Sequence, residues 1–429
     1  MDVWQGTKHL TLAALATPDG FFRFGRPGYY AYLNSPSDSK PTTAMEVMKR
    51  LTTNLLSGKV DQYLTLEQAL AILGVRVALT VTASSHVART LTASHMRLCV
   101  GILEDRQSLF TYQYAEPALA FAAMSLTHDH GWLILLDRLR EAMSATYIHA
   151  GHRGEIGAQL LLLMASDRCT VDTGIGYARN YMTSQTMNDP TIPTIPLSRF
   201  LSILTGLDSH IAIDNFSDRI SNMYVRLIQF VQVFAKPGKK QICEMFRRAA
   251  GIVVKPGSEQ VDLIIPLLVH KERNRLHEVV PVPEQMSALL IQVKCFGSSR
   301  TIEKDTSVCS LNLLRNVATE NASFSDRLNK KLDYLSLLME VGSHAASRSS
   351  VRVFSREDVG ADADPKQLSI AINGLRPNVV LHQDIPHLDQ ITSSFDELMI
   401  AGYNPAKISS SSNEAIRNLK LSLDLVYKS

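Results

Sequence analysis

Two strand-like segments near the middle of the chain carry polar residues within apolar runs. The first runs from Val261 to Pro266 and contains Asp262, and the second runs from Leu289 to Lys294 and contains Gln292. Burying an unpaired carboxylate or ammonium group costs free energy, so each of these groups requires a partner. We therefore expect two buried strands whose polar residues, Asp262 and Lys294 among them, meet at one shared site.

An acid followed by a neutral acceptor and a lysine on the next strand is the layout of a divalent-metal phosphodiesterase site. Asp262 offers the hard anionic oxygen that Mg²⁺ or Mn²⁺ prefers, whereas Gln292 offers only an amide oxygen. Lys294 follows Gln292 by two residues and so shares its face of the strand. Its ammonium group could orient water or stabilise phosphate charge. The structural alternative for Asp262 is a strand-end residue that hydrogen-bonds a neighbouring loop.

Composition indicates an ordinary folded protein. The 429 residues are 45% hydrophobic and 20% charged, which suits two or three domains with sizeable cores. A net charge of +3 is too small to indicate nucleic-acid binding by itself. The five cysteines never form a CxxC pair, which argues against a disulfide framework or a zinc site and suits a reducing compartment. Thr127 to Gly131 contains two histidines and an aspartate, but we expect a surface loop there.

Features of secreted or membrane proteins are not found. The first residues lack the basic and apolar regions of a signal peptide. The longest purely apolar stretch, Ala118 to Met124, is far too short to span a bilayer. We expect an intracellular protein of the nucleus or cytoplasm, which could be that of a host cell, with no membrane partner.

The first part of the chain, residues 1–144, is expected to be a mostly helical module. Apolar residues recur at helical spacing over Thr43 to Leu56 and Leu66 to Val81. Glycines and a proline within residues 21–30 (FFRFGRPGYY) predict an aromatic turn. No GxxxxGK(S/T) motif occurs, so we expect no ATP binding by this chain alone.

Residues 145–400 are expected to form an α/β domain, and 401–429 a Ser-rich linker with a C-terminal helix. The sheet is expected to begin after Lys236-Pro237-Gly238, and the link from His270 to Met286 to be a surface loop. Helices are expected at 156–165, 197–205, 220–234, 301–318 and 415–426. Strands are expected at 251–255, 261–269, 288–295, 334–341, 350–354 and 368–371.

This order of elements resembles the PD-(D/E)xK nuclease superfamily, in the QxK variant of Mrr-like restriction enzymes. The resemblance implies a restriction-endonuclease-like mixed sheet flanked by helices. It also implies Asp262 as the acidic metal ligand, Gln292 at the (D/E) position and Lys294 as the motif's lysine. Glu155 matches the extra acidic residue that the family often carries on its first core helix, where the helix dipole alone also explains an acid.

A broader resemblance covers nearly the whole chain. The succession from Phe24-Gly25-Arg26-Pro27, through residues 93–99, to Gly151-His152-Arg153-Gly154-Glu155 looks like a group of fungal proteins related to Crinkler-type effectors. In that group a P-loop ATPase domain precedes a restriction-endonuclease-like domain. The resemblance implies that residues 1–144 correspond to the last part of such an ATPase domain.

The function expected is metal-dependent cleavage of a nucleic acid, with DNA favoured over RNA, by an effector-like protein. Basic residues would hold the phosphate backbone without reading sequence: Lys239, Lys240, Arg247, Arg248, Lys255, Lys271, Arg273 and Arg275. A solvated face is the plain alternative for such a run. The alternative function is a catalytically inactive nuclease fold that binds nucleic acid or a host protein.

Overall fold

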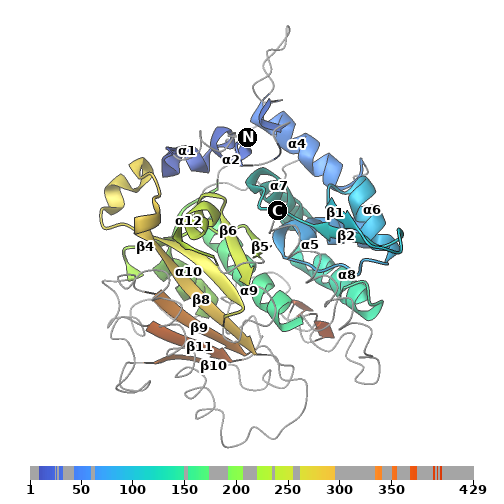
Figure 1. The fold of residues 1–429 in the computed structure, drawn as a ribbon. Helices are drawn as coiled ribbons and strands as arrows, with labels where there is room; N and C mark the ends of the chain where they lie inside the picture. Colours follow the sequence, from blue (N-terminus) through green and yellow to red (C-terminus); the bar gives the residue numbers. More distant parts are fainter. Residues whose placement is uncertain are drawn as a thin grey trace, which may run out of the picture.

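The computed structural model describes most of the chain up to residue 294 and selected strands beyond it (Figure 1). The described residues are 9–24, 26, 29–31, 43–58, 63–148, 153–172, 192–205, 220–233, 237–254, 261–294, 334–340, 350–354, 368–373, 390, 391, 394, 397 and 398. They form helices packed on a mixed sheet, which confirms the prediction of a mixed α/β fold. The helices expected at 301–318 and 415–426 lie outside the described residues.

The described elements before residue 145 are helices and one hairpin. The helices are α1 (Leu12–Ala16), α2 (Pro18–Phe22), α4 (Ala44–Leu55), α5 (Leu66–Arg76), α6 (His86–Ser94), α7 (Pro117–His130) and α8 (Trp132–Ser144). Strands β1 (Leu98–Ile102) and β2 (Leu109–Tyr112) pair antiparallel. Thr43 and Glu46 begin α4 with a capping box, in which each side chain accepts the other's backbone N–H.

Nine strands of the described part form one mixed sheet, with the main order β10-β11-β9-β8-β7-β4-β3. They are β3 (Ile195–Pro196), β4 (Met223–Val225), β5 (Gln229–Val233), β6 (Ala250–Val254), β7 (Leu263–Val269), β8 (Met286–Lys294), β9 (Tyr334–Glu340), β10 (Ser350–Phe354) and β11 (Leu368–Asn373). Strand β7 is antiparallel to its neighbours β8, β6 and β4. Strand β8 is parallel to β9, and β9 is parallel to β11. Strand β5 extends the sheet by pairing with β6.

Different helices cover the two faces of this sheet. One core joins α5, α7, α9 (Arg153–Asp172) and α10 (Leu197–Thr205) to Leu289 and Ile291 of β8. We call this the first core. The second core joins α1 and α12 (Lys239–Arg247) to Ile264 and Leu290. Because neighbouring residues of a strand point to opposite faces, the two cores lie on opposite sides of β8.

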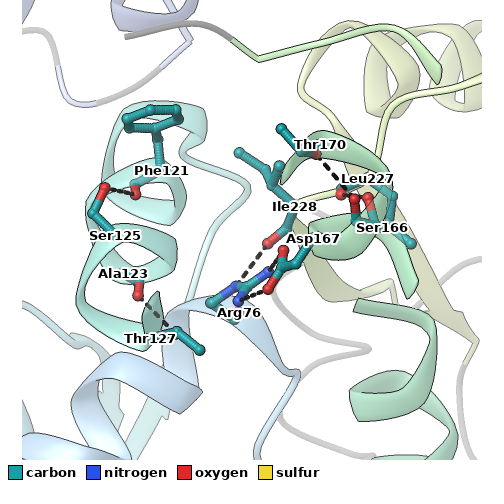
Figure 2. A network of polar contacts seen from close by, with 10 residues as sticks. All are labelled: Arg76, Phe121, Ala123, Ser125, Thr127, Ser166, Asp167, Thr170, Leu227 and Ile228. Atoms are coloured by element: carbon teal, nitrogen blue, oxygen red, sulfur yellow. Dashed lines mark hydrogen bonds and ion pairs between the residues drawn. The ribbon is translucent and has the colours of Figure 1, made fainter. Parts of the chain in front are cut away.

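A buried ion pair ties the N-terminal helices to the first core (Figure 2). Both Nη atoms of Arg76, on α5, contact the Asp167 carboxylate of α9, at 2.8 and 2.7 Å. The Nε of Arg76 also donates to the Ile228 carbonyl, just before β5, at 3.2 Å. Neither side chain is more than 4% exposed. The helices before residue 144 and the sheet after it therefore share one interior.

Two predictions about where the sheet begins are wrong. Residues 220–234 were expected to be a helix, but Met223–Val225 and Gln229–Val233 are strands. Nearly every described residue there is buried, and a short run that is buried on all sides does not distinguish a strand from a helix by periodicity. The sheet accordingly begins before Lys236, and Gly238 precedes the helix α12 instead of a strand.

The strands expected after α12 are confirmed as β6 to β11, with ends shifted by three residues at most. The link after β7 is largely exposed, as predicted, and contains short 3₁₀ turns η4 (Arg273–Glu278) and η5 (Pro283–Gln285). His128 to His130 form the last turn of α7, so the loop expected there is wrong. Among the described helices, none has the length and apolar character that crossing a membrane requires.

Candidate functional site

Asp262 lies at the junction of three strands. Its backbone carbonyl accepts the N–H of Val254 at the end of β6, and its own N–H donates to the Ile291 carbonyl, both at 2.9 Å. Its carboxylate Oδ2 accepts the backbone N–H of Val293 at 2.7 Å. The carboxylate thus takes the place of a backbone acceptor and closes the ladder between β7 and β8. The structural alternative for Asp262, a strand-end residue that makes a structural hydrogen bond, accounts for this contact.

Gln292 lies beside Asp262 on the neighbouring strand. The antiparallel ladder ends at the pair of Leu263 and Ile291, and Asp262 and Gln292 are the next residue on each side of it. The Gln292 side chain is 5% exposed. Its Oε1 has no hydrogen-bond partner within the described part of the protein. A buried polar oxygen without a donor costs about 1–3 kcal/mol, so this atom is expected to accept from a donor that the described residues do not supply.

Lys294 is the last residue of β8, and the structure describes its backbone alone. It follows Gln292 by two residues, which puts both residues on the same face of the sheet. Leu290, two residues before Gln292, belongs to the second core, whereas Val293 packs against the first core. The structure therefore brings Asp262, Gln292 and the backbone of Lys294 to one end of adjacent strands.

Glu155 lies on a helix and not on one of these strands. It lies in the first turn of α9, the helix whose buried residues share the first core with Leu289 and Ile291. Gln292 belongs to the opposite face, which α12 covers. By this alternation, α9 packs on the face of β8 opposite to the one to which Gln292 belongs. In the chain, α12 directly precedes β6, whereas several other elements lie between α9 and β6.

Two of the basic residues expected to hold a nucleic acid are turned into the protein. Arg247 is 8% exposed and donates to the Pro281 carbonyl at 2.6 Å. Arg248 is 7% exposed, donates to the carbonyls of Phe24 and Ala115, and pairs with Glu244 at 2.9 Å. Both guanidinium groups serve the fold. The assignment of these two residues to a phosphate-binding surface is therefore corrected.

The remaining basic residues divide between the two ends of the sheet. Lys271, Arg273 and Arg275 are exposed on the segment after β7, and Arg275 contacts Glu272 and Glu278. The seven residues of β7 separate that segment from Asp262 by about 24 Å. Lys239 and Lys240 begin α12, on the face that carries Gln292. Lys255 lies outside the described residues.

The donor set at the Asp262 end consists of one carboxylate and one neutral amide oxygen. Hard oxygen donors of this kind suit Mg²⁺ or Mn²⁺ better than a softer metal. In the part of the chain that the structure describes, no group of three or more histidine, cysteine, aspartate or glutamate side chains could hold a metal ion. Any cation bound by Asp262 and Gln292 would thus need further donors from water, from a substrate phosphate or from residues outside such a cluster.

Comparisons with known proteins identify a family and no activity. A family model described as a domain of unknown function (DUF8736) matches residues 65–310, more than half of the chain. The matched region runs from α5 to beyond β8 and so contains Asp262, Gln292 and Lys294. No curated protein and no solved structure matches the sequence.

Proposed function

This chain belongs to the family described as a domain of unknown function (DUF8736), and we propose that it is a metal-dependent nuclease. Its reaction would be hydrolysis of phosphodiester bonds in a nucleic acid. The observation that carries the proposal is the buried Oε1 atom of Gln292, which has no donor in the described structure and lies beside Asp262. A cation or a cation-bound water would satisfy that oxygen and use the neighbouring carboxylate.

The arrangement of strands supports a restriction-endonuclease-like fold. The resemblance to the PD-(D/E)xK superfamily implies a helix, three strands, a helix and a fourth strand, in that order. Here α12 is followed by the antiparallel strands β6, β7 and β8, and β9 returns parallel to β8. Two parallel neighbouring strands need a crossover connection between them, and residues 295–333 are long enough to provide one. In such a fold α12 would take the place of the first core helix, which the resemblance assigned to the helix that carries Glu155.

Each residue of the site has a chemical role in the proposed reaction. Asp262 and Gln292 would hold Mg²⁺, which supplies a Lewis acid for the phosphate and lowers the pKa of a bound water. Lys294 would orient the attacking water or neutralise charge on the phosphate, because an ammonium group donates up to three hydrogen bonds. The burial of Gln292 strengthens these electrostatic interactions by excluding bulk water.

The nucleic acid would reach the site along the face that α12 covers. Lys239 and Lys240 lie at the N-terminus of α12, where the helix dipole also favours phosphate. Lys271 and Arg273 could contact the same nucleic-acid strand only several nucleotides away from the site at Asp262. DNA is the favoured substrate, and a role as a Crinkler-like effector follows from the sequence resemblance alone.

Lys294→Ala tests the proposed activity. The unmodified chain should cleave plasmid DNA in the presence of Mg²⁺ and not in the presence of EDTA. Lys294→Ala should lower the cleavage rate by about 100-fold or more, because it removes a charge that acts in the transition state. Lys49→Ala, on the exposed face of α4, is the matched control and should cleave at the unmodified rate. Absence of Mg²⁺-dependent cleavage of both DNA and RNA by the unmodified chain would contradict the proposal.

One observation favours a second candidate, an inactive nuclease fold that binds a nucleic acid or a host protein. The Asp262 carboxylate already accepts the Val293 N–H, so the acid has a structural role that needs no metal. In that case Lys294→Ala would change binding little and there would be no cleavage to lose. Measuring DNA binding and cleavage on the same samples separates the two candidates. Binding through phosphates should also weaken steeply as salt is raised.

A further inference from the structure

Polar residues end three parallel strands of the sheet. Lys294 is the last residue of β8, Glu340 of β9 and Asn373 of β11. The parallel ladders pair Lys294 with Glu340 and Glu340 with Asn373, so the three residues form one row. The carboxyl ends of parallel strands are where ligands bind in open α/β sheets. The row lies at the same end of the sheet as Asp262, because β7 runs in the opposite direction to β8.

The alternation along β9 places Glu340 on the face that carries Gln292. Leu335, Leu337 and Met339 are buried in the first core, together with Leu289 and Ile291 of the neighbouring strand. Residues of a strand alternate between faces, so Glu340 belongs to the opposite face. Lys294 pairs with Glu340 in register and lies on that face too. The Cα atoms of such neighbours are about 5 Å apart.

The site so far has one carboxylate, that of Asp262. Gln292 contributes a neutral oxygen, and the helix that carries Glu155 packs on the other face of the sheet. Asp262 is then the one carboxylate that the described strand ends provide beside Gln292. Strands β7 and β9 flank β8 on its two sides and lie about 10 Å apart. The end of β9 therefore flanks the end of β8 on the side opposite β7.

We propose that Glu340 supplies the second carboxylate of the cation site. This inference rests on the proposed function and extends it to a residue on a strand that is distant in the sequence. Glu340 would replace the negative charge that Gln292 lacks, and Lys294, two residues beyond Gln292, ends the same strand. The structural alternative is that Glu340 does no more than neutralise Lys294 as its cross-strand neighbour.

The test measures cation binding separately from cleavage. Mn²⁺ alone would be titrated into the full chain by calorimetry, and binding would be compared among the unmodified chain, Glu340→Gln, Glu340→Asp and Asp262→Asn. Glu104→Gln, an exposed acid in the β1–β2 hairpin, is the matched control. Thermal unfolding followed by circular dichroism would establish that each variant is folded.

We expect Glu340→Gln to weaken Mn²⁺ binding by about tenfold or more, since affinity for a hard cation follows the number of charged ligands. Glu340→Asp keeps the carboxylate and should bind more tightly than Glu340→Gln, whereas Glu104→Gln should bind as the unmodified chain does. Equal Mn²⁺ affinity in Glu340→Gln and the unmodified chain, with binding lost in Asp262→Asn, would overturn the role of Glu340 and leave the nuclease proposal intact. Equal binding by Glu340→Gln and Glu340→Asp would overturn it too. No Mn²⁺ binding by the unmodified chain would overturn both proposals.

Discussion

Arg76 shows how a single buried charge can hold distant parts of this chain together. Its guanidinium group is fully buried, contacts both Asp167 oxygens and the Ile228 carbonyl, and lies 5.1 Å from the Trp132 ring centroid. Figure 2 shows Asp167 and Ile228 converging on it from separate elements. A bidentate pair of this kind is strong because two parallel hydrogen bonds are made to charged groups. Losing one partner leaves the other as an unpaired charge in the interior.

Arg76→Met is expected to lower the free energy of unfolding by about 3–5 kcal/mol, because the Asp167 carboxylate would remain buried without its cation. Chemical denaturation followed by circular dichroism would measure the change. The control is Arg138→Met, which removes an exposed pair with Glu141 and should cost less than about 1 kcal/mol. A cost for Arg76→Met as small as that of the control would contradict the role assigned to the buried pair.

At the scale of elements, Arg226 joins the ends of two helices. The residue is fully buried between β4 and β5, and its Nη atoms donate to the carbonyls of Leu15 and Arg247 at 2.8 and 3.2 Å. These carbonyls belong to the last turns of α1 and α12. Helix C-terminal carbonyls lack partners within the helix and carry partial negative charge, so a cation there is favourable. Burial nevertheless lowers the pKa of Arg226 to about 9.

Arg226→Met is expected to destabilise the protein by about 2–5 kcal/mol, since two charge-assisted hydrogen bonds to buried carbonyls are lost. The segment containing α1 should also become more susceptible to limited proteolysis, because the bond to Leu15 attaches it to the sheet. Arg89→Met, on the exposed side of α6, is the matched control. If both variants unfold at the same denaturant concentration and are cleaved at the same rate, Arg226 does not anchor α1.

At the scale of the whole molecule, the boundary expected near residue 144 runs through a shared interior. The first core contains residues of α5 and α7 as well as residues of α9 and β8. The N-terminal part also contacts the second core, where the Leu12 N–H donates to the Val279 carbonyl at 2.8 Å. The family match likewise spans residues 65–310 and crosses that boundary.

A fragment of residues 145–429 is therefore expected not to fold alone, because it would expose the apolar surfaces that α5 and α7 cover. Expression of the fragment with and without a separate fragment of residues 1–144 would measure this. Folded, soluble material should appear when both pieces are present. A cooperative thermal transition from residues 145–429 alone would show that the two parts are independent domains.

Much of the element order could be predicted from local patterns. The strands from β6 to β11 stand out because short apolar runs end at charged or turn-forming residues. The segment of β4 and β5 could not be recognised, because a run buried on all sides has no amphipathic period. Helix α12 was not predicted either, because its basic residues suggested a solvated surface. In the structure, Arg247 and Arg248 are buried.

The candidate site was predictable only in part, for a physical reason. The side-chain period of a strand is local, so the sequence by itself determined that Asp262, Gln292 and Lys294 interrupt apolar strands and that Gln292 and Lys294 share a face. Strand pairing and helix packing depend on contacts between distant residues. Only the tertiary structure decided that Asp262 and Gln292 follow the same end of the β7–β8 ladder, that Glu340 aligns with Lys294, and that the helix carrying Glu155 packs on the first core.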